Sequence, residues 1–272
     1  MTSVSIIIVS FNAKKHLENC LNSLTCARPA TPHEIVVVDN ASSDGSAGMV
    51  KSRWPEIKVI EQSRNGGFAA GNNAGIRATD GALILLLNND TVVPAGAIDA
   101  LVQRLLAHPE AAVAGPRLTD GNGRAELSFG RMISPVNELR QKLTMVLYRR
   151  GVRWVSRHVE RATEREHEVD WVSGACLLVR RQDAEQAGLL DERYFLYTED
   201  VDFCAAIRAT GRRVIFTPAA HVVHLGGMSR ATDPDAMNVA YRKSQLAFYE
   251  KHHPRWAPVL RAYLRVKGQL PR

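Results

Sequence analysis

Four short apolar runs, separated by segments with helical periodicity, constrain the fold of this 272-residue chain most strongly. An alternation of this kind predicts a largely parallel sheet with helices on both of its faces. In such sheets, ligands bind outside the carboxyl ends of the strands. The runs cover residues 4–9, 35–38, 58–60 and 83–87. We therefore predict an α/β fold whose functional residues follow these runs.

The second half of the chain is less regular, although its turns and helices can still be located. Asp120-Gly121-Asn122-Gly123 is a strong signal for a hairpin turn. Gly211 is a suitable stop for the helix before it. The elements expected here are helices over 97–108, 181–187 and 200–210, and strands over 111–115, 169–180, 213–216 and 221–225.

Polar residues follow the first two runs. Ser10 and Asn12 come after the first, and Asp39 and Asp44 after the second. A carboxylate at the end of a strand can accept hydrogen bonds from a base N–H or a ribose hydroxyl. An Asx turn that caps the next helix explains Asp39 equally well.

A glycine-rich segment follows the third run. In Asn65-Gly66-Gly67-Phe68, paired glycines at a helix start let the backbone approach a ligand, and the helix N-terminus favours anions. The segment is not a Walker loop, and it follows the wrong strand for a dinucleotide fingerprint. A tight turn without a ligand is the alternative.

Asn88-Asn89-Asp90 follows the fourth run. An acid here can hold Mg²⁺ or Mn²⁺ together with phosphate oxygens, although a strand-ending turn is the simpler reading. His221 and His224 fall on opposite faces of a predicted strand. We therefore expect only one of them, His224, as a metal ligand, with a structural role as the alternative.

Three acids, Glu199, Asp200 and Asp202, lie within four residues beside aromatic residues. Carboxylates in such a setting are expensive to bury without a partner. One of them can act as a positioned general base. Capping of the following helix is the other explanation.

Together these segments resemble the inverting family 2 glycosyltransferases of the GT-A type, and within them the bacterial rhamnosyltransferase-like members. The resemblance runs from about residue 4 to 229. The matching segments are Val9-Ser10-Phe11-Asn12, Val37-Val38-Asp39-Asn40-Ala41-Ser42-Ser43-Asp44-Gly45, Asn65-Gly66-Gly67-Phe68, Leu87-Asn88-Asn89-Asp90, Trp171-Val172-Ser173-Gly174-Ala175, Thr198-Glu199-Asp200-Val201-Asp202 and His224-Leu225-Gly226-Gly227.

The resemblance assigns roles to these residues. It implies that Asp200 is the catalytic base and that Asp90 and His224 hold a divalent cation, Mg²⁺ or Mn²⁺. The residues implied at the nucleotide sugar are Ser10, Asn12, Asp39, Asp44, Asn65, Gly67, Phe68, Asn88 and Asn89. Those expected at the acceptor are Trp171, Gly174, Glu199 and Asp202, with capping or a pair with Arg208 as the alternative for Asp202.

The chain departs from the family pattern at one position. Asn88 stands where the D-x-D element usually has its first acid. An amide oxygen can bind a hard cation but brings no charge, so Asp90 is the only anion of the element. We therefore predict that the cation binds chiefly together with the diphosphate of the donor.

The chain is basic, with a net charge of +7, which favours anionic partners. Segment 139–157 has six basic residues and no acid, and segment 241–272 has eight basic residues and one acid. Apolar residues are interleaved in both, which suits peripheral contact with an anionic membrane. Solvated helices packed on the domain are the alternative. Nucleic acid is a weaker choice, because no reader motif is present.

These observations predict the organisation and activity of the chain. We expect a nucleotide-sugar-binding half over 1–115, an acceptor-binding half over 116–230 and a basic helical extension over 231–272. The expected reaction moves a sugar, with dTDP-rhamnose as the favoured donor, to an acceptor hydroxyl in cell-surface polysaccharide or lipid-linked glycan synthesis. The alternatives are a sugar nucleotidyltransferase, for which residues 10–15 lack a glycine-rich loop, and a non-catalytic sugar-nucleotide-binding protein.

The expected location is cytoplasmic, with peripheral contact at the inner face of the cell membrane. No run of apolar residues is long enough to cross a bilayer. The four cysteines form no C-x-x-C pair and are expected to be reduced thiols.

Overall fold

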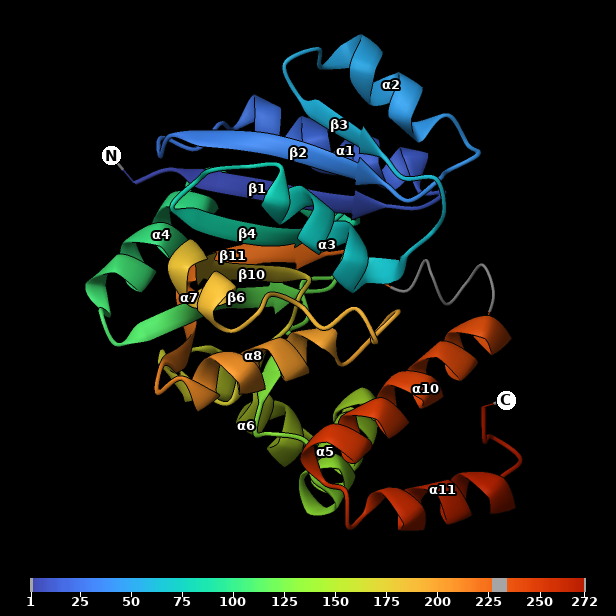
Figure 1. The fold of residues 1–272 in the computed structure, drawn as a ribbon. Coiled ribbons are helices and arrows are strands. Elements are labelled where there is room, and N and C mark those ends of the chain that lie inside the picture. Colours follow the sequence, from blue (N-terminus) through green and yellow to red (C-terminus); the bar gives the residue numbers. More distant parts are fainter. Residues whose placement is uncertain (1, 227–233, 272) are drawn as a thin grey trace.

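The computed structural model describes residues 2–226 and 234–271, and its centre is a nine-stranded sheet with helices on both faces (Figure 1). The strand order is β3-β2-β1-β4-β10-β6-β11-β5, with β8 paired to β11 off this path. The strands are β1 (Val4–Ser10), β2 (His33–Asp39), β3 (Lys58–Glu61), β4 (Leu83–Asn88), β5 (Thr91–Val92), β6 (Ala111–Thr119), β8 (His167–Val169), β10 (Cys176–Arg180) and β11 (Arg213–His224).

The first four strands of this order are parallel, as the apolar runs predicted. Ser10 lies opposite Asp39 in the register of β1 and β2, and Val9 lies opposite Asn88 in that of β1 and β4. Strand β10 is antiparallel to both of its neighbours, whereas β11 runs parallel to β6. The predicted α/β fold with a mostly parallel sheet is confirmed, and the polar residues after the runs meet at one edge.

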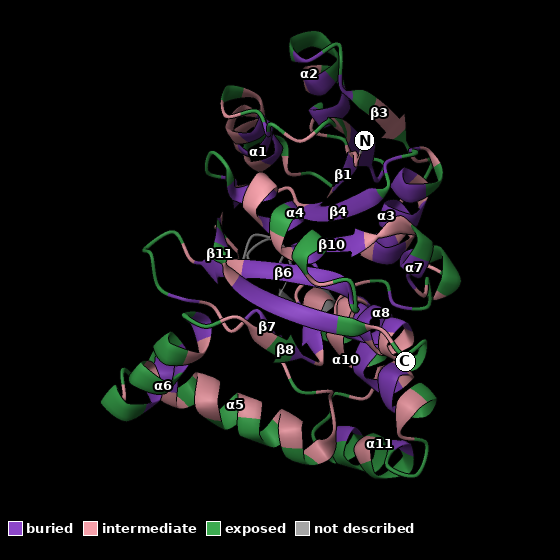
Figure 2. Cartoon of the chain, turned by 90° about the vertical axis from the view of Figure 1, so that its left-hand side faces the viewer, coloured by how far each residue is buried: buried purple, intermediate pink, exposed green. Residues whose placement is uncertain are grey.

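Two apolar layers lie on the two faces of the sheet (Figure 2). Helices α1, α2 and α4 cover one face, and α3, α7 and α8 cover the other. The described helices are α1 (Lys14–Cys26), α2 (Ser46–Arg53), α3 (Gly67–Arg77), α4 (Ala97–Ala107), α5 (Pro135–Arg149), α6 (Arg153–Thr163), α7 (Arg181–Gln186), α8 (Glu199–Ala209), α10 (Pro234–His252) and α11 (Ala257–Val266).

The expected long strand over 169–180 is wrong. The chain forms β9 (Trp171–Val172), which pairs with β7 (Phe129–Gly130) in a separate two-stranded sheet, and then enters the main sheet as β10. Gly174 lies at the break, where a Cβ atom would stand 3.2 Å from the Phe68 ring and 3.3 Å from Asp200 Cβ. The strand is therefore interrupted where Gly174 packs between Phe68 and Asp200. The alternation of apolar residues within 169–180 could not predict this contact with distant segments.

The two short strands expected over 213–216 and 221–225 form one strand, β11, with a register shift between Thr217 and His221. Pro218 lies inside this shift and cannot donate to the sheet ladder. An irregularity that absorbs the proline lets the strand continue to His224.

The basic segments form helices below the sheet in Figure 1. Residues 139–157 lie in the hairpin of α5 and α6, which has a small core of its own around Tyr148, Val155 and Val159. The described part of the predicted extension, residues 234–271, contains α10 and α11. Among the described helices, none combines the length and the apolar character that crossing a bilayer would require. The four cysteines are free thiols, and three of them are buried.

Candidate active site

The residues predicted at the nucleotide meet at the carboxyl ends of β1, β2 and β4. Asn89 Nδ2 donates to the Val9 carbonyl over 3.1 Å and to Ser10 Oγ over 3.3 Å. Asp39 is buried at the end of β2, where its Oδ2 accepts a hydrogen bond from the Ser42 backbone N–H. The Asn89 bonds join the ends of β4 and β1, and the Asn40 N–H, which donates to the Ser10 carbonyl over 2.8 Å, joins the end of β2 to β1.

Two buried acceptors at this edge have no hydrogen-bond partner among the described residues. They are Asp39 Oδ1 and Asn40 Oδ1. The Asn40 amide nitrogen donates to the Gly67 carbonyl over 2.9 Å, which fixes the side chain beside the glycine-rich turn. A buried acceptor without a donor carries a desolvation cost. This pair is therefore suited to donors on a ligand, such as a base N–H or a ribose hydroxyl.

Asn12 and Asp44 shape the loop after β2. Asn12 has a positive φ of 48°, and its Oδ1 accepts from the Ser43 backbone N–H over 2.8 Å. Asp44 accepts from the backbone N–H groups of Lys14 and Ser46 over 2.8 and 3.0 Å. Both side chains thus connect the β1 and β2 loops, and these bonds give them a positioning role at the pocket.

The glycine-rich turn packs directly against the loop before α8. Asn65 Oδ1 accepts from the Gly67 N–H over 3.0 Å, and Phe68 N–H donates to the Phe195 carbonyl over 2.9 Å. Gly67 has a φ of +84°, and a Cβ atom there would stand 2.2 Å from the Phe195 carbonyl oxygen. Both the conformation and the close approach require glycine.

Asp200 lies in the first turn of α8. Its Oδ2 accepts from the Gly174 N–H and its Oδ1 from the Val201 N–H, each over 2.8 Å. Burial raises the pKa of Asp200, although these backbone hydrogen bonds oppose the shift. Tyr197 and Thr198, the two residues before α8, have φ values of 68° and 67°, a conformation that is strained for residues other than glycine. A strained turn thus holds a basic carboxylate in one orientation.

Asp90 and His224 meet because β5 pairs with the end of β11, which places His224 opposite Thr91. His224 Nε2 is 3.3 Å from Asp90 Oδ1 and 3.4 Å from Asn88 Nδ2. Asp90 Oδ1 is buried and accepts no hydrogen bond in the described structure. Burial opposes ionisation, but the attraction of His224 lowers the pKa of Asp90. His221 instead lies beside Thr119, so the two histidines do not share a site, as predicted.

Glu126 belongs to the same cluster and was not predicted from the sequence. Its Oε2 lies 3.0 Å from His224 Nδ1, so the imidazole stands between two carboxylates. Although burial opposes it, interaction with Asp90 and Glu126 raises the pKa of His224 to about 10. The predicted turn at Asp120–Gly123 directs the chain back along β6 and brings Glu126 to this place. A separation of 98 residues left no local signal for this contact.

Short backbone contacts connect the Asp90 group with Asp200. The Asn88 N–H donates to the Ala175 carbonyl over 3.0 Å, and the neighbouring residue, Gly174, binds Asp200. The predicted catalytic base and the predicted cation ligands therefore share one edge of the sheet.

Asp202 and Trp171, two of the residues predicted at the acceptor, have structural partners. Asp202 is buried beneath α10, where its carboxylate accepts from Lys251 Nζ over 2.8 Å and lies 2.6 Å from His252 Nε2. The alternative of a pair with Arg208 is wrong, because Arg208 binds Asp170 over 2.8 Å. Trp171 is buried and its indole N–H donates to the Arg131 carbonyl.

Glu199 is buried, and its Oε2 has no hydrogen-bond partner among the described residues. Burial and the neighbouring Asp200 raise the pKa of Glu199 well above its usual range. Gly227 of the predicted His-Leu-Gly-Gly motif lies outside the described residues.

The family is established by comparison with known proteins. The model of the family described as Glycosyl transferase family 2 matches residues 5–188 of this chain. The chain therefore belongs to glycosyl transferase family 2, and it is a glycosyltransferase.

Individual relatives are consistent with this assignment. The chain is 30% identical to N-acetylglucosaminyl-diphospho-decaprenol L-rhamnosyltransferase of Mycobacterium tuberculosis, in an alignment that covers 100% of this chain and 96% of that protein. The fold resembles mannosyltransferase PcManGT of Pyrobaculum calidifontis in complex with GDP-Man and Mn²⁺, with a TM-score of 0.63, 19% identity and coverage of 96% and 68% of the two chains. It also resembles S. aureus TarS 1–349 in complex with UDP-GlcNAc, with a TM-score of 0.60, 16% identity and coverage of 91% and 66%. These structures share the GT-A fold that the sequence predicted.

Proposed function

We propose that this glycosyltransferase moves a rhamnosyl group from dTDP-rhamnose to a hydroxyl group of a lipid-linked glycan, with inversion at the anomeric carbon. The observation that carries the proposal is the shared edge, where Asp200 and the Asp90–His224 pair are joined through Asn88, Ala175 and Gly174. The full-length similarity to a rhamnosyltransferase named for a diphospho-decaprenol substrate supports the choice of sugar and acceptor.

The nucleotide part of the donor would bind at the ends of β1 and β2. Asp39 and Asn40 supply buried acceptors for donors on the base or ribose. The turn from Asn65 to Phe68 opens α3, whose positive N-terminal end would favour the diphosphate although the Gly67 and Phe68 N–H groups already have acceptors. Asn88 and Asn89 complete this side of the pocket.

The donor set at the end of β4 fits a divalent cation. Asp90 offers a buried oxygen, and His224 offers a ring nitrogen 3.3 Å from it once a bound cation displaces the imidazole proton. Among the described residues, no group of three or more His, Cys, Asp or Glu side chains is arranged to hold a metal ion. Two protein ligands and the neutral Asn88 fit a cation that also needs phosphate oxygens. Bound Mg²⁺ or Mn²⁺ would neutralise charge that develops on the departing diphosphate.

Glu126 would orient His224 for this role. A carboxylate on Nδ1 fixes the tautomer and the ring orientation of a histidine whose Nε2 serves as a ligand. The 3.0 Å contact between Glu126 Oε2 and His224 Nδ1 has this geometry. Glu126 is therefore proposed as a positioning residue.

Asp200 would act as the general base. It takes the proton of the acceptor hydroxyl while the oxygen attacks the anomeric carbon and the bond to the diphosphate breaks. The hydrogen bonds from Gly174 and Val201 hold the carboxylate in place for this step. Because the attack is a single displacement, the anomeric configuration inverts.

The acceptor side would include Gly174 and Glu199, which lie beside Asp200. Trp171 and Asp202 would support this side through the contacts that fix β9 and α10. A lipid-linked acceptor resides in a membrane. We therefore also propose that the enzyme acts in the cytoplasm, in peripheral contact with the inner face of the cell membrane.

Product analysis tests this proposal. Purified enzyme, Mg²⁺ or Mn²⁺ and radiolabelled dTDP-rhamnose are incubated with a polyprenyl-diphospho-N-acetylglucosamine, with UDP-, GDP- and other dTDP-sugars in parallel. The expected product is the rhamnosylated lipid, with the anomeric configuration opposite to that of the donor. Transfer of a different sugar overturns the choice of donor, and absence of any transfer across the full donor set overturns the proposed reaction.

A further inference from the structure

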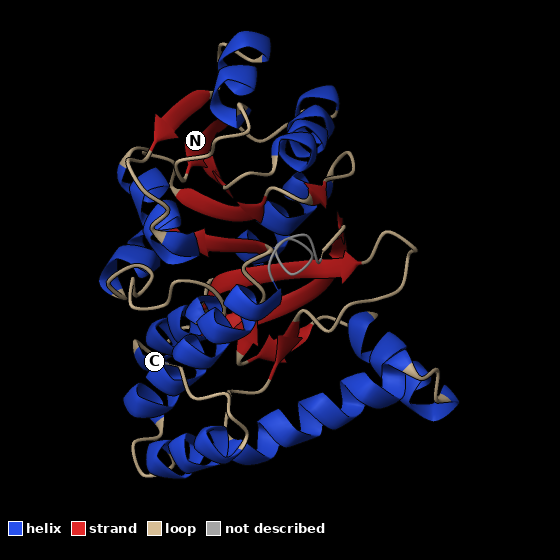
Figure 3. Ribbon diagram, turned by 90° about the vertical axis from the view of Figure 1, so that its right-hand side faces the viewer, coloured by secondary structure: helices blue, strands red, loops and turns tan. Residues whose placement is uncertain are grey.

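The outer face of the α5–α6 hairpin is apolar where a surface helix is normally polar. Val136, Leu139, Leu143 and Val146 recur at intervals of three and four residues, so they form one stripe along α5. All four are exposed, and 69% of the Leu139 surface is accessible. Tyr148 is the only fully buried residue of α5 in the described structure. This long helix lies along the lower edge of the molecule in Figures 2 and 3.

The neighbouring helix carries positive charge without partners. Arg153, Arg157 and Arg161 are spaced four residues apart on α6 and therefore share one face. In residues 2–226 and 234–271, no carboxylate forms an ion pair with any of the three, and Trp154 beside them is 67% exposed. The arginines of α6 lack ion-pair partners within the described residues, and α5, the helix that α6 packs against, carries the apolar stripe, so the hairpin suits phosphates at an apolar boundary.

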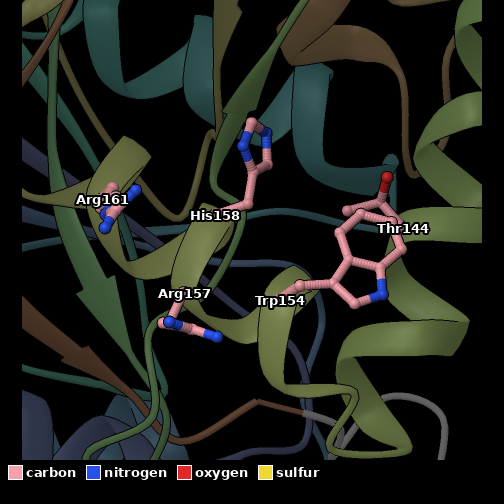
Figure 4. Close-up of a pocket in the computed structure, with 5 residues that line it drawn as sticks. All are labelled: Thr144, Trp154, Arg157, His158 and Arg161. Carbon is pink, nitrogen blue, oxygen red and sulfur yellow. The ribbon is translucent and has the colours of Figure 1, made fainter.

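A hollow lies between the two helices, with a volume of about 430 Å³ (Figure 4). It is lined by Arg157, Arg161, His158 and Trp154 from α6 and by Thr144 from α5. The guanidinium groups and the Thr144 hydroxyl are donors, and no acidic side chain lines the hollow. The hollow is larger than a phosphate group, and its donor set suits one.

We infer that the α5–α6 hairpin docks on a bilayer that contains anionic phospholipid, with a lipid phosphate seated in the hollow of Arg157 and Arg161. The stripe of α5 would enter the boundary between headgroups and acyl chains, where Trp154 is also favoured. Arginine binds phosphate through paired N–H donors, and cations near an anionic leaflet strengthen the attachment. A soluble phosphate compound would not cover the apolar stripe.

The other basic segment is less suited to this role. On α10 and α11, Lys251 binds Asp202 and Asp191, and Arg261 binds Glu250. These cations stabilise the fold and are partly neutralised. Arg255 and Arg265 form no ion pair in the described structure, so what distinguishes the hairpin is the hollow that Arg157, Arg161 and Thr144 line.

A second hollow of about 390 Å³ extends the first toward the candidate active site. The two share Thr144 and His158, and the second reaches Leu127, the residue after Glu126. Arg131 and Arg140 also line it. If the proposed transfer to a lipid-linked acceptor is correct, docking of this face brings membrane-borne phosphates next to the segment that positions His224.

Vesicle co-sedimentation of the full chain tests the docking face. Wild-type protein is expected to bind vesicles of phosphatidylcholine and phosphatidylglycerol, and to bind pure phosphatidylcholine much more weakly. Arg157→Ser combined with Arg161→Ser should weaken partitioning roughly 30-fold, from the usual contribution of a basic residue near an anionic surface. Arg255→Ser combined with Arg265→Ser removes the same amount of charge on and beside α11. Because this region is not the proposed docking face, the control should change vesicle partitioning by less than about threefold.

The apolar stripe is tested separately by Leu139→Ser combined with Leu143→Ser. Wild-type binding should persist in part at 0.5 M NaCl, where charge attraction is screened, and this remainder should disappear in the variant. Unchanged partitioning of the α6 double variant, or an equal loss in the α11 control, overturns the assignment. Saturable binding of glycerol phosphate by wild-type protein that does not bind the anionic vesicles indicates a soluble phosphate site and also overturns it.

Circular dichroism and thermal unfolding establish that each variant is folded; the substituted side chains lie on the surface. Vesicle binding requires neither donor nor turnover. A negative result therefore rejects the proposed docking face without testing the proposed glycosyl transfer, which is tested by product analysis.

Discussion

Replacement of Glu126 by Gln tests whether the contact to His224 Nδ1 prepares the histidine as a cation ligand. The change keeps the shape of the side chain and removes its charge. Partners of this kind typically contribute 10- to 100-fold to metal affinity. About a third of the Glu126 side chain is exposed, so solvent screens the interaction. We therefore expect the lower end of the range, roughly a tenfold weaker cation affinity.

The assay is titration of Mn²⁺ into enzyme saturated with dTDP, with free Mn²⁺ measured by electron paramagnetic resonance. Glu110→Gln is the matched control, because Glu110 lies 3.2 Å from the Nδ1 atom of another histidine, His108. That variant should bind Mn²⁺ as wild type does, and neither change should alter dTDP binding without the cation. An unchanged Mn²⁺ affinity in Glu126→Gln, with a weakened one in His224→Ala, would refute the reasoning.

The remaining predictions concern four residues: Asn88, Asp200, Glu199 and Asp202. Wild-type enzyme should bind Mn²⁺ much more tightly with dTDP than without it, because Asn88 brings no charge; Asn88→Asp should strengthen the nucleotide-free binding in calorimetry. Asp200→Asn should lower turnover by about 10²–10⁴ with donor affinity retained. Because burial raises the pKa of Asp200, and the base must be deprotonated, the acid limb of the wild-type kcat profile should lie above the usual carboxyl range. Burial raises the pKa of Glu199 in the folded protein, so the free energy of unfolding of the wild type should fall as the pH rises above the unfolded-state pKa of about 4.3. Glu199→Gln removes this titration. In urea titrations the variant should therefore be more stable than wild type at pH 8 but not at pH 4. Asp202→Ala should cost about 2–3 kcal/mol in the same assay, less than a fully buried pair, because Lys251 is partly exposed and retains Asp191; unchanged stability would return Asp202 to the acceptor site.

The parts of the site that the sequence predicted are those that follow strands. Residues such as Asp39 and Asp90 were found because parallel strands end at one edge, which converts a position in the chain into a position in space. The apolar runs of β1 and β4 are buried on both faces of the sheet, so continuous hydrophobicity in the sequence was sufficient to predict these two central strands. Here local pattern and tertiary structure agree.

The parts that could not be predicted depend on contacts between distant segments. Glu126 reaches His224 across 98 residues, and Asp202 is tied to α10 by partners 49 and 50 residues away. The break at Gly174 results from its packing between Phe68 and Asp200. The periodicity of apolar residues within a single segment cannot predict contacts between residues that are far apart in the chain.

The segment before the candidate base packs directly against the glycine-rich turn. Gly67 fits beneath the Phe195 carbonyl only because it has no Cβ, and the same carbonyl accepts the Phe68 N–H. Leu196 separates Phe195 from the strained Tyr197–Thr198 pair, which leads the chain into α8 and towards Asp200. Positive φ values at two adjacent non-glycine residues cost about 1–3 kcal/mol each, so packing against the turn must hold them. The hydrogen bond between Phe68 and Phe195 therefore joins the glycine-rich turn to the segment that carries Asp200, although the two segments lie more than a hundred residues apart in the chain.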